Sequence, residues 1–261
     1  MLKLEHDIFG GGETPGGVAF EKVLLFACTL ILTLIFGALE RKSLSDYGLP
    51  VGKIFGKDFW AGFLWGFGIL TINIALMAFL HCYSFGAIVL SGTGILKYAT
   101  AWAMAYLAVG IAEEFAFRGY LQYTLTQGMG FWPAAVVTSI LFGLIHLDVE
   151  APWQAICNIV VLALFVCVAL RRTGNLWFPI GAHMAFDWGD SFFYSAESSR
   201  VQGHLFNASV HGSKWFSGGS AGPEGNIFNV FLVAAGIVLL SRIYPLVKYP
   251  AERTAPAPSA R

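Results

Sequence analysis

Long runs of apolar residues, separated by short polar stretches, make up most of the 261-residue chain. A helix that crosses a bilayer needs about 20 mostly apolar residues. Seven runs approach or exceed this length, and they lie near residues 20–40, 58–80, 98–125, 131–147, 154–170, 176–194 and 226–247. A shorter, glycine-interrupted stretch at 83–95 is either a re-entrant segment or an eighth short helix. The pattern therefore predicts an all-α, polytopic integral membrane protein with 7–8 transmembrane helices.

The two ends of the chain differ from this apolar body. Residues 1–19 form a polar N-terminal segment without the basic start of a signal peptide, so we expect the first span to be retained. Residues 20–248 are predicted to form a single membrane-embedded domain. Residues 249–261 are rich in Pro and Ala and are expected to be a disordered tail.

Composition agrees with a membrane location. The chain is 56% hydrophobic and only 12% charged, whereas soluble domains carry roughly 25% charged residues. The formal net charge is zero, so nothing indicates nucleic acid as a partner. The four cysteines form no CxxC pair, and we interpret them as small buried apolar residues, not as a metal or disulfide framework.

The distribution of lysine and arginine predicts the orientation. Most of these residues lie in loop 41–57, in the turn after the fifth run and at the C-terminal end. Cytoplasmic loops are enriched in positive charge. With seven spans, the C-terminus is therefore predicted to be cytoplasmic, and the membrane is expected to be a bacterial inner (plasma) membrane.

Several ionisable residues interrupt the apolar runs. Glu113 and Glu114 lie near the middle of the third run, His146 ends the fourth, and His183 and Asp187 lie in the sixth. A charged group at the bilayer centre costs about 2.5–3.5 kcal/mol on insertion scales and usually faces the bundle interior or a water-filled cavity. These residues are therefore candidates for a functional site.

Their spacing indicates which side chains share a helix face. Residues four apart lie on the same face, so Glu114 can pair with Arg118, and His183 with Asp187. Glu113 is rotated about 100° from Glu114 and has no cation nearby in the sequence, so we expect it to point into the core. Both pairs could instead be purely structural, as an ion-pair clamp and as a hydrogen bond that locks a helix.

Phe142 and His146 also share a face, which adds an imidazole from a third helix. A carboxylate and two imidazoles that meet in one cavity are suited to proton transfer, to activation of a water molecule or to binding a divalent metal. The residue types and their spacing leave these three chemistries open.

Three motifs occur in order along these runs: "EEFAFR" at 113–118, "FGLIH" at 142–146 and "HMAFD" at 183–187. Together they resemble the EExxxR, FxxxH and HxxxN/D motifs of the CPBP family of intramembrane endopeptidases. This family contains CAAX proteases and bacteriocin-processing enzymes and is also called the Abi family. The resemblance covers about residues 96–195.

The resemblance implies a hydrolase that cleaves a peptide bond within the membrane. Glu113 and His146 would hold and activate the attacking water, and His183 and Asp187 would stabilise the oxyanion. Supporting positions would be Glu114, Arg118 and Phe142. The substrate would be a membrane-associated or lipidated peptide or protein, with the lipid bilayer around the enzyme.

The sequence differs from the motif of the eukaryotic prenyl-protein endopeptidases at one position, where it has Asp187 in place of Asn. An ionised Asp cannot donate a hydrogen bond to an oxyanion. Asp187 would therefore either be protonated, or orient His183, or help to bind a metal. The ligands of a zinc ion would be His146, His183, Asp187 and Glu113. We favour a metal-free mechanism, because Glu and His can activate water and the chain has no HExxH motif.

Two other functions fit buried charges in a membrane protein. One is a non-catalytic membrane scaffold or chaperone, whose function would survive loss of Glu113. The other is a proton- or metal-coupled transporter, although the sequence shows neither repeat symmetry nor paired broken helices.

Overall fold

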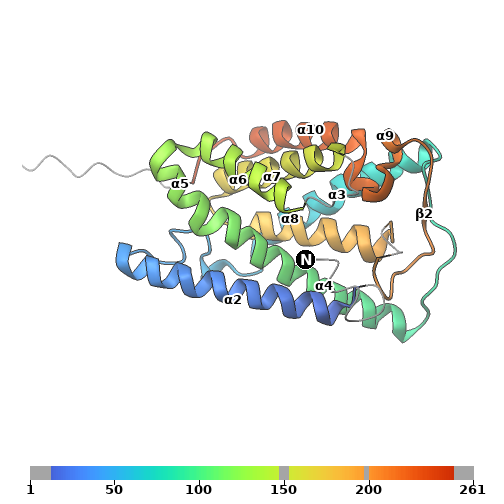
Figure 1. Cartoon of the computed structure of the whole chain (residues 1–261), viewed down its shortest axis with the longest axis horizontal. Coiled ribbons are helices and arrows are strands. Elements are labelled where there is room, and N and C mark those ends of the chain that lie inside the picture. Colours follow the sequence, from blue (N-terminus) through green and yellow to red (C-terminus); the bar gives the residue numbers. More distant parts are fainter. Residues whose placement is uncertain (1–12, 147–152, 197–199, 250–261) are drawn as a thin grey trace, which may run out of the picture.

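A computed structural model describes residues 13–146, 153–196 and 200–249 as a bundle of helices (Figure 1). The long helices of the bundle are α2 (Pro15–Glu40), α3 (Lys57–Phe79), α4 (Thr93–Glu114), α6 (Phe131–Ile145), α7 (Trp153–Thr173), α8 (Trp177–Trp188) and α10 (Ile227–Ile243). The shorter elements are η1 (Val51–Lys53), β1 (Tyr83–Ser84), η2 (Phe115–Leu121), α5 (Gln122–Met129), η3 (Gly189–Phe193), β2 (Ser209–Val210), α9 (Lys214–Ser217) and η4 (Gly219–Gly225).

The prediction of an all-α membrane protein is confirmed by these helices. Within the described residues, five helical stretches are long and apolar enough to cross a bilayer: Pro15–Glu40, Lys57–Phe79, Thr93–Met129, Trp153–Thr173 and Gly219–Ile243. Two of the seven predicted ranges form shorter helices, α6 with 15 residues and α8 with 12. The count of 7–8 spans stays a prediction.

The apolar stretch 83–95 does not form the separate eighth short helix that was one of its two predicted forms. Tyr83 and Ser84 form β1, which pairs antiparallel with β2, and helix α4 begins at Thr93. Gly86 has a positive φ of 65°, and a Cβ there would overlap the backbone of Asn207. Glycine therefore lets this segment pack closely against the 200–210 loop as extended chain.

Helix α8 lies in the centre of the bundle, between α3 and α4 (Figure 1). Glycine makes the close approach to α3 possible, because a Cβ at Gly62, Gly66 or Gly181 would overlap backbone of the facing helix. Small residues at contacts of this kind let membrane helices pack backbone to backbone. The consequence is that α8 presents its polar residues directly to α4.

The ends of the described chain differ slightly from the predicted boundaries. Helix α2 begins at Pro15, with Thr14 accepting a hydrogen bond from the backbone N–H of Gly17. At the other end, Tyr249 is buried, and its N–H donates to the carbonyl of Arg171. Residues 250–261 of the predicted tail lie outside the described residues.

The expectation that all four cysteines are buried is wrong for two of them. Cys82 and Cys167 are buried, whereas Cys28 and Cys157 are exposed on the surface of the bundle, and all four are free. Both exposed cysteines lie on long apolar helices, where a small apolar side chain also suits a lipid-facing position. The sequence pattern did not distinguish the two environments.

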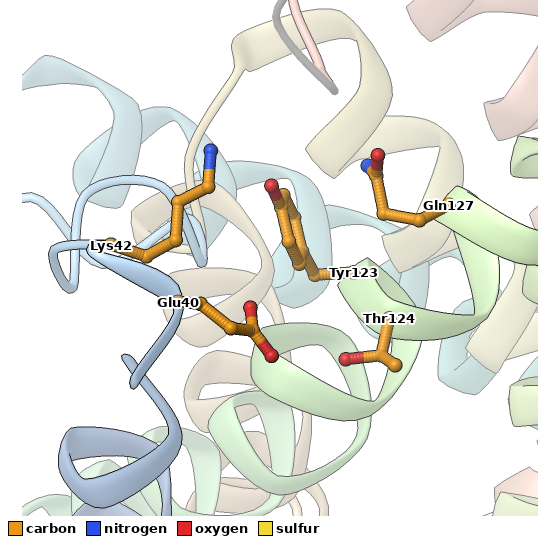
Figure 2. Close-up of a pocket in the computed structure, with 5 residues that line it drawn as sticks. All are labelled: Glu40, Lys42, Tyr123, Thr124 and Gln127. Atoms are coloured by element: carbon orange, nitrogen blue, oxygen red, sulfur yellow. The ribbon is translucent and has the colours of Figure 1, made fainter. Parts of the chain in front are cut away.

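One pocket lies where the C-terminal end of α2 meets α5 (Figure 2). It has a volume of about 380 Å³ and is lined by Glu40, Lys42, Tyr123, Thr124 and Gln127. All five of these residues carry a polar group, and none of the candidate residues from the sequence is among them. The pocket is therefore separate from the group of charged residues described next.

Candidate active site

The three charged residues of the first motif lie where α4 changes into a π-helical segment. Glu113 and Glu114 end α4, and Arg118 lies in η2, whose backbone is kinked at Gly119. All three charged side chains are buried. Short π-helical segments often occur at functional sites, because they change which way the following side chains point.

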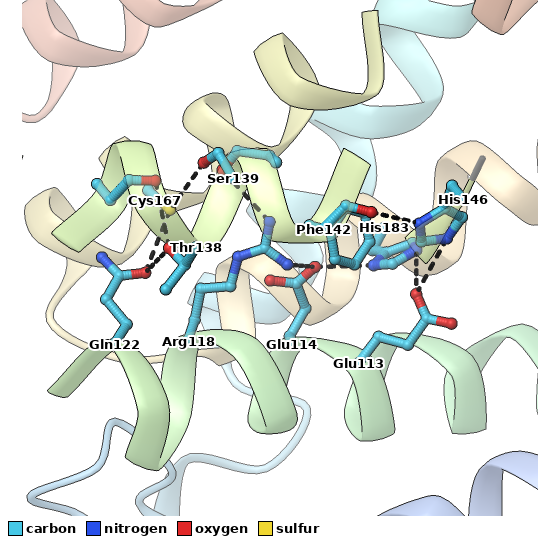
Figure 3. Close-up of polar contacts among 12 residues, drawn as sticks. Glu113, Glu114, Arg118, Gln122, Thr138, Ser139, Phe142, His146, Cys167 and His183 are labelled. Carbon is cyan, nitrogen blue, oxygen red and sulfur yellow. Dashed lines mark hydrogen bonds and ion pairs between the residues drawn. The ribbon is translucent and has the colours of Figure 1, made fainter. Parts of the chain in front are cut away.

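Arg118 and Glu114 form a buried ion pair (Figure 3). Nη1 of Arg118 donates to Oε1 of Glu114 at 3.2 Å, and the guanidinium lies 4.4 Å from the centre of the Phe142 ring. Nη2 also donates to the carbonyl of Ala163 on α7, at 3.5 Å. The arginine thus connects α4, α6 and α7, as the clamp interpretation expects.

His183 faces carboxylates on both sides of its ring. Nδ1 donates to Oε1 of Glu114 at 2.8 Å, and Nε2 is 3.4 Å from Oδ2 of Asp187. Only a doubly protonated imidazole can donate from both nitrogens, and this arrangement suits that form. The ring therefore directs N–H groups, and not a lone pair, toward its neighbours.

The ring nitrogens of His146 have different partners from those of His183. His146 follows the last residue of α6, and its Nδ1 is 2.7 Å from the backbone carbonyl of Phe142. Because a carbonyl only accepts hydrogen bonds, Nδ1 is the protonated nitrogen, which leaves Nε2 as an acceptor in the neutral ring. The side chain is 35% exposed, so Nε2 lies at the more open edge of the site.

Glu113 lies between the two histidines. Its Oε2 is 3.9 Å from Nε2 of His146 and 3.8 Å from Nε2 of His183 (Figure 3). Oε2 is buried and has no hydrogen-bond partner within the described part of the chain. These distances are too long for direct hydrogen bonds and are short enough for one water molecule to bridge two of the groups.

The expectation that Glu113 has no nearby cation holds only along its own helix. Nζ of Lys22, on α2, is 3.1 Å from Oε1 of Glu113. Lys22 is not among the candidate residues predicted from the sequence. The charged pair Glu21–Lys22 within a largely apolar helix is a signal that could have drawn attention to Lys22. Glu113, however, lies in another helix at no fixed spacing from Lys22, so the sequence could not identify it as the partner.

All seven candidate residues from the sequence lie together, on α4, η2, α8 and the C-terminal end of α6. We call the six polar ones, without Phe142, the polar cluster: Glu113, Glu114, Arg118, His146, His183 and Asp187. A second buried group adjoins it and was not predicted. In this group Oε1 of Gln122 accepts hydrogen bonds from Thr138 and Cys167. Its residues are common in helix packing, and no spacing in the sequence distinguishes them.

The contacts that the polar cluster already makes bear on whether it could hold a metal ion. Among the described residues, no group of three or more His, Cys, Asp or Glu side chains has an arrangement that could hold one. The two ring nitrogens of His183 face carboxylates, and the Lys22 ammonium already binds one oxygen of Glu113. A zinc ligand needs a free lone pair directed at the metal.

Comparisons with known proteins agree with the motif resemblance. Residues 95–189 match the family model "Type II CAAX prenyl endopeptidase Rce1-like". A curated relative, the uncharacterized protein YpbD of Bacillus subtilis (strain 168), is 30% identical over 81 residues, which are 31% of this chain and 39% of that protein. No solved structure matches the chain significantly. The resemblance to CAAX-type intramembrane endopeptidases is thus confirmed for residues 95–189, which contain the whole polar cluster.

Proposed function

We propose that the protein is an intramembrane endopeptidase in which Glu113 activates a water molecule. The observation that carries the proposal is the position of Oε2 of Glu113, a buried carboxylate oxygen within 3.9 Å of imidazole nitrogens from two other helices. The family match over residues 95–189 supports endopeptidase activity in general. The catalytic roles below are our assignment to individual residues.

Glu113 and His146 are suited to hold the water. The carboxylate oxygen and the unprotonated Nε2 of His146 are both acceptors, so each can bind one hydrogen of the same water molecule. The water oxygen then attacks the scissile carbonyl carbon, and one of its protons passes to Glu113. When the tetrahedral intermediate collapses, the C–N bond breaks and Glu113 returns this proton to the leaving amine.

His183 is suited to stabilise the oxyanion of that intermediate. Its Nε2–H makes only a 3.4 Å contact with Asp187, whereas Nδ1 is held at 2.8 Å by Glu114. The weaker contact leaves the Nε2–H group available to donate to developing negative charge. In this proposal Asp187 orients His183 and does not donate itself, while Glu114 and Arg118 fix the ring from the other side.

The mechanism that we propose uses no metal ion. The geometry of the described residues offers no set of three metal ligands, and the Lys22 ammonium lies beside the carboxylate that would have to bind one. A second cation at that position would be repelled by the first. We therefore expect cleavage to persist in the presence of a chelator such as EDTA.

We propose a membrane-associated or lipidated peptide or protein as the substrate. The matched family is described as a CAAX prenyl endopeptidase, and the polar cluster lies among apolar helices that would face a bilayer. A substrate that partitions into the membrane reaches such a site by lateral diffusion. We further propose a bacterial inner membrane, with the C-terminus in the cytoplasm.

Alanine substitutions test the proposal. We expect Glu113→Ala, His146→Ala and His183→Ala each to reduce cleavage of quenched membrane-soluble peptides by about 10²–10⁴-fold, as loss of an acid–base group does. Peptide fragments are identified by mass spectrometry, and thermal unfolding in detergent reports whether each variant is folded. Wild-type cleavage by all three variants would contradict the proposal.

Two other outcomes would favour the alternative functions. If a cellular phenotype of the wild-type protein survives Glu113→Ala, the protein acts as a scaffold or chaperone. If proteoliposomes show Glu113-dependent flux of protons or of a metal ion, and no peptide is cleaved, the buried charges belong to a transporter.

A further inference from the structure

Lys22 belongs to α2, which lies outside the family match, and contacts the central carboxylate of the polar cluster. Its Nζ is 3.1 Å from Oε1 of Glu113 and 3.1 Å from Oε1 of Glu21. The Lys22 side chain is 20% exposed and that of Glu113 is 8% exposed. The Lys22–Glu113 pair is therefore largely shielded from solvent, unlike the mobile ion pairs of protein surfaces.

This contact makes the two oxygens of Glu113 different. Oε1 binds the ammonium of Lys22, and Oε2 faces Nε2 of His146 and of His183. The terminal torsion of a glutamate is soft and roughly two-fold, so an unrestrained carboxylate would rotate and exchange its two oxygens. A cation on one oxygen holds the other in place.

The position of Lys22 on α2 shows that this side chain is directed inward. It is the eighth residue of a 26-residue apolar helix, about 10 Å from the helix start at 1.5 Å per residue. Phe26 lies one turn further on the same face, and its ring packs against Phe115 at a distance of 5.5 Å. Lys22 and Phe26 thus form part of the α2 surface that packs against α4 and η2.

Burial of a lysine in this interface needs a compensating interaction. A positive charge within an apolar helix costs about 2.5–3.5 kcal/mol on insertion scales unless it is paired or reaches the interface. Two carboxylates supply that pairing here, and in turn the ammonium offsets the cost of burying the charge of Glu113. The interaction thus serves the carboxylate that the proposed mechanism needs.

We propose that Lys22 is a positioning residue for Glu113: its ammonium binds Oε1 and keeps Oε2 directed at the space between His146 and His183. This inference rests on the proposed function of Glu113 as the base. It also assigns a role to α2, which becomes part of the active site and not only a membrane-spanning helix. Lys22 itself does not touch the substrate in this account.

Steady-state kinetics separate positioning from substrate binding. We expect Lys22→Met to lower kcat by about 10–100-fold, the cost of misplacing a reacting group by about 1 Å, with KM changed less than about threefold. Lys22→Arg retains the charge and should stay within about fivefold of wild type. Lys97→Met is the matched control, because Lys97 lies over the ring of Tyr98 in the first turns of α4 and is expected to leave kcat unchanged.

A membrane-permeant carbodiimide tests the contact without any substrate. It activates a carboxyl group, which an adjacent amine attacks to form an isopeptide bond while the reagent leaves as a urea. Mass spectrometry of digested wild-type protein should detect a bond between Lys22 and Glu113, and none in Glu113→Gln. Cross-linked protein should also have lost its peptidase activity.

The cross-linking and kinetic results together decide whether Lys22 positions Glu113. Absence of the Lys22–Glu113 cross-link overturns the contact itself. A cross-link together with wild-type kcat in both Lys22 variants overturns the positioning role and leaves the proposed function intact. If the wild-type protein cleaves no peptide, the proposed function fails first, and the ion pair is then structural.

Discussion

At the scale of single residues, the site depends on charges that are buried in pairs. Arg118 is fully buried and holds Glu114, which in turn holds His183. Removal of one partner from such a pair leaves an uncompensated charge in a low-dielectric environment. Stability and catalysis are therefore coupled through the same carboxylate.

Substitution of Arg118 by Met tests this coupling. We expect a loss of about 3–5 kcal/mol in the free energy of unfolding, because Glu114 would remain buried without its arginine partner. Thermal unfolding in detergent measures the loss as a lower Tm, and adding Glu114→Gln to the variant should restore part of it. Arg171→Met is a milder control, because Arg171 lies over the rings of Phe131 and Trp132 and its removal should cost about 1 kcal/mol.

Asp187 has a separate test. If it only orients His183, Asn can accept the same contact, so Asp187→Asn should keep kcat/KM within about tenfold of wild type. Asp187→Ala should lose about 10²-fold or more, since its ring partner is gone. An Asn variant as inactive as Glu113→Gln would mean that the carboxylate itself takes part in the reaction.

The contacts that could be predicted from sequence are those within one helix. Glu114 with Arg118, Phe142 with His146 and His183 with Asp187 are four residues apart, so helix geometry alone brings them together. The meeting of the three motifs followed from the family resemblance. The Lys22–Glu113 pair joins two helices, and no periodicity within either helix could reveal it.

At the scale of elements, glycine contacts between α3 and α8 position the histidine of the third motif. A Cβ at Gly66 would overlap the backbone carbonyl of Ala182, the residue that precedes His183. By contrast, nothing lies within 4 Å of a Cβ at Gly68. The two glycines are two residues apart on the same helix and provide a matched comparison.

We expect Gly66→Ala to destabilise the protein by about 1–3 kcal/mol, because α3 and α8 must move apart to make room for the methyl group. Gly68→Ala should be neutral or slightly stabilising, since Ala is a better helix former than Gly by about 1 kcal/mol. Thermal unfolding of both variants in the same detergent makes the comparison. Equal Tm values would contradict the proposed packing role of Gly66.

Two features at this scale could not be predicted from the pattern of apolar residues. The π-helical segments η2 and η3 follow the polar ends of α4 and α8, and a change of helix type leaves the hydrophobic pattern nearly unaltered. The pairing of β1 with β2 connects Ser84 to Ser209 across 125 residues. Local sequence carries no information on such a long-range contact, so the strand pairing in the apolar stretch 83–95 could not be predicted.

At the scale of the whole molecule, the predicted orientation remains to be tested. Positive charge in loop 41–57 and at the C-terminal end predicts a cytoplasmic C-terminus. We expect a C-terminal fusion to a fluorescent protein to be fluorescent in bacterial cells, and a C-terminal fusion to a periplasmic phosphatase to be inactive. The reverse pattern would mean that the chain crosses the membrane an additional time or in the opposite direction.

The central claim is that Glu113 activates water for peptide hydrolysis without a metal ion, and one measurement tests it most directly. Purified wild type and Glu113→Gln are incubated in detergent with the same quenched peptides, each with and without a chelator. We predict that wild type cleaves equally well under both conditions and that Glu113→Gln is slower by about 10²–10⁴-fold. Cleavage by Glu113→Gln at the wild-type rate, or loss of wild-type cleavage on chelation, would contradict this account.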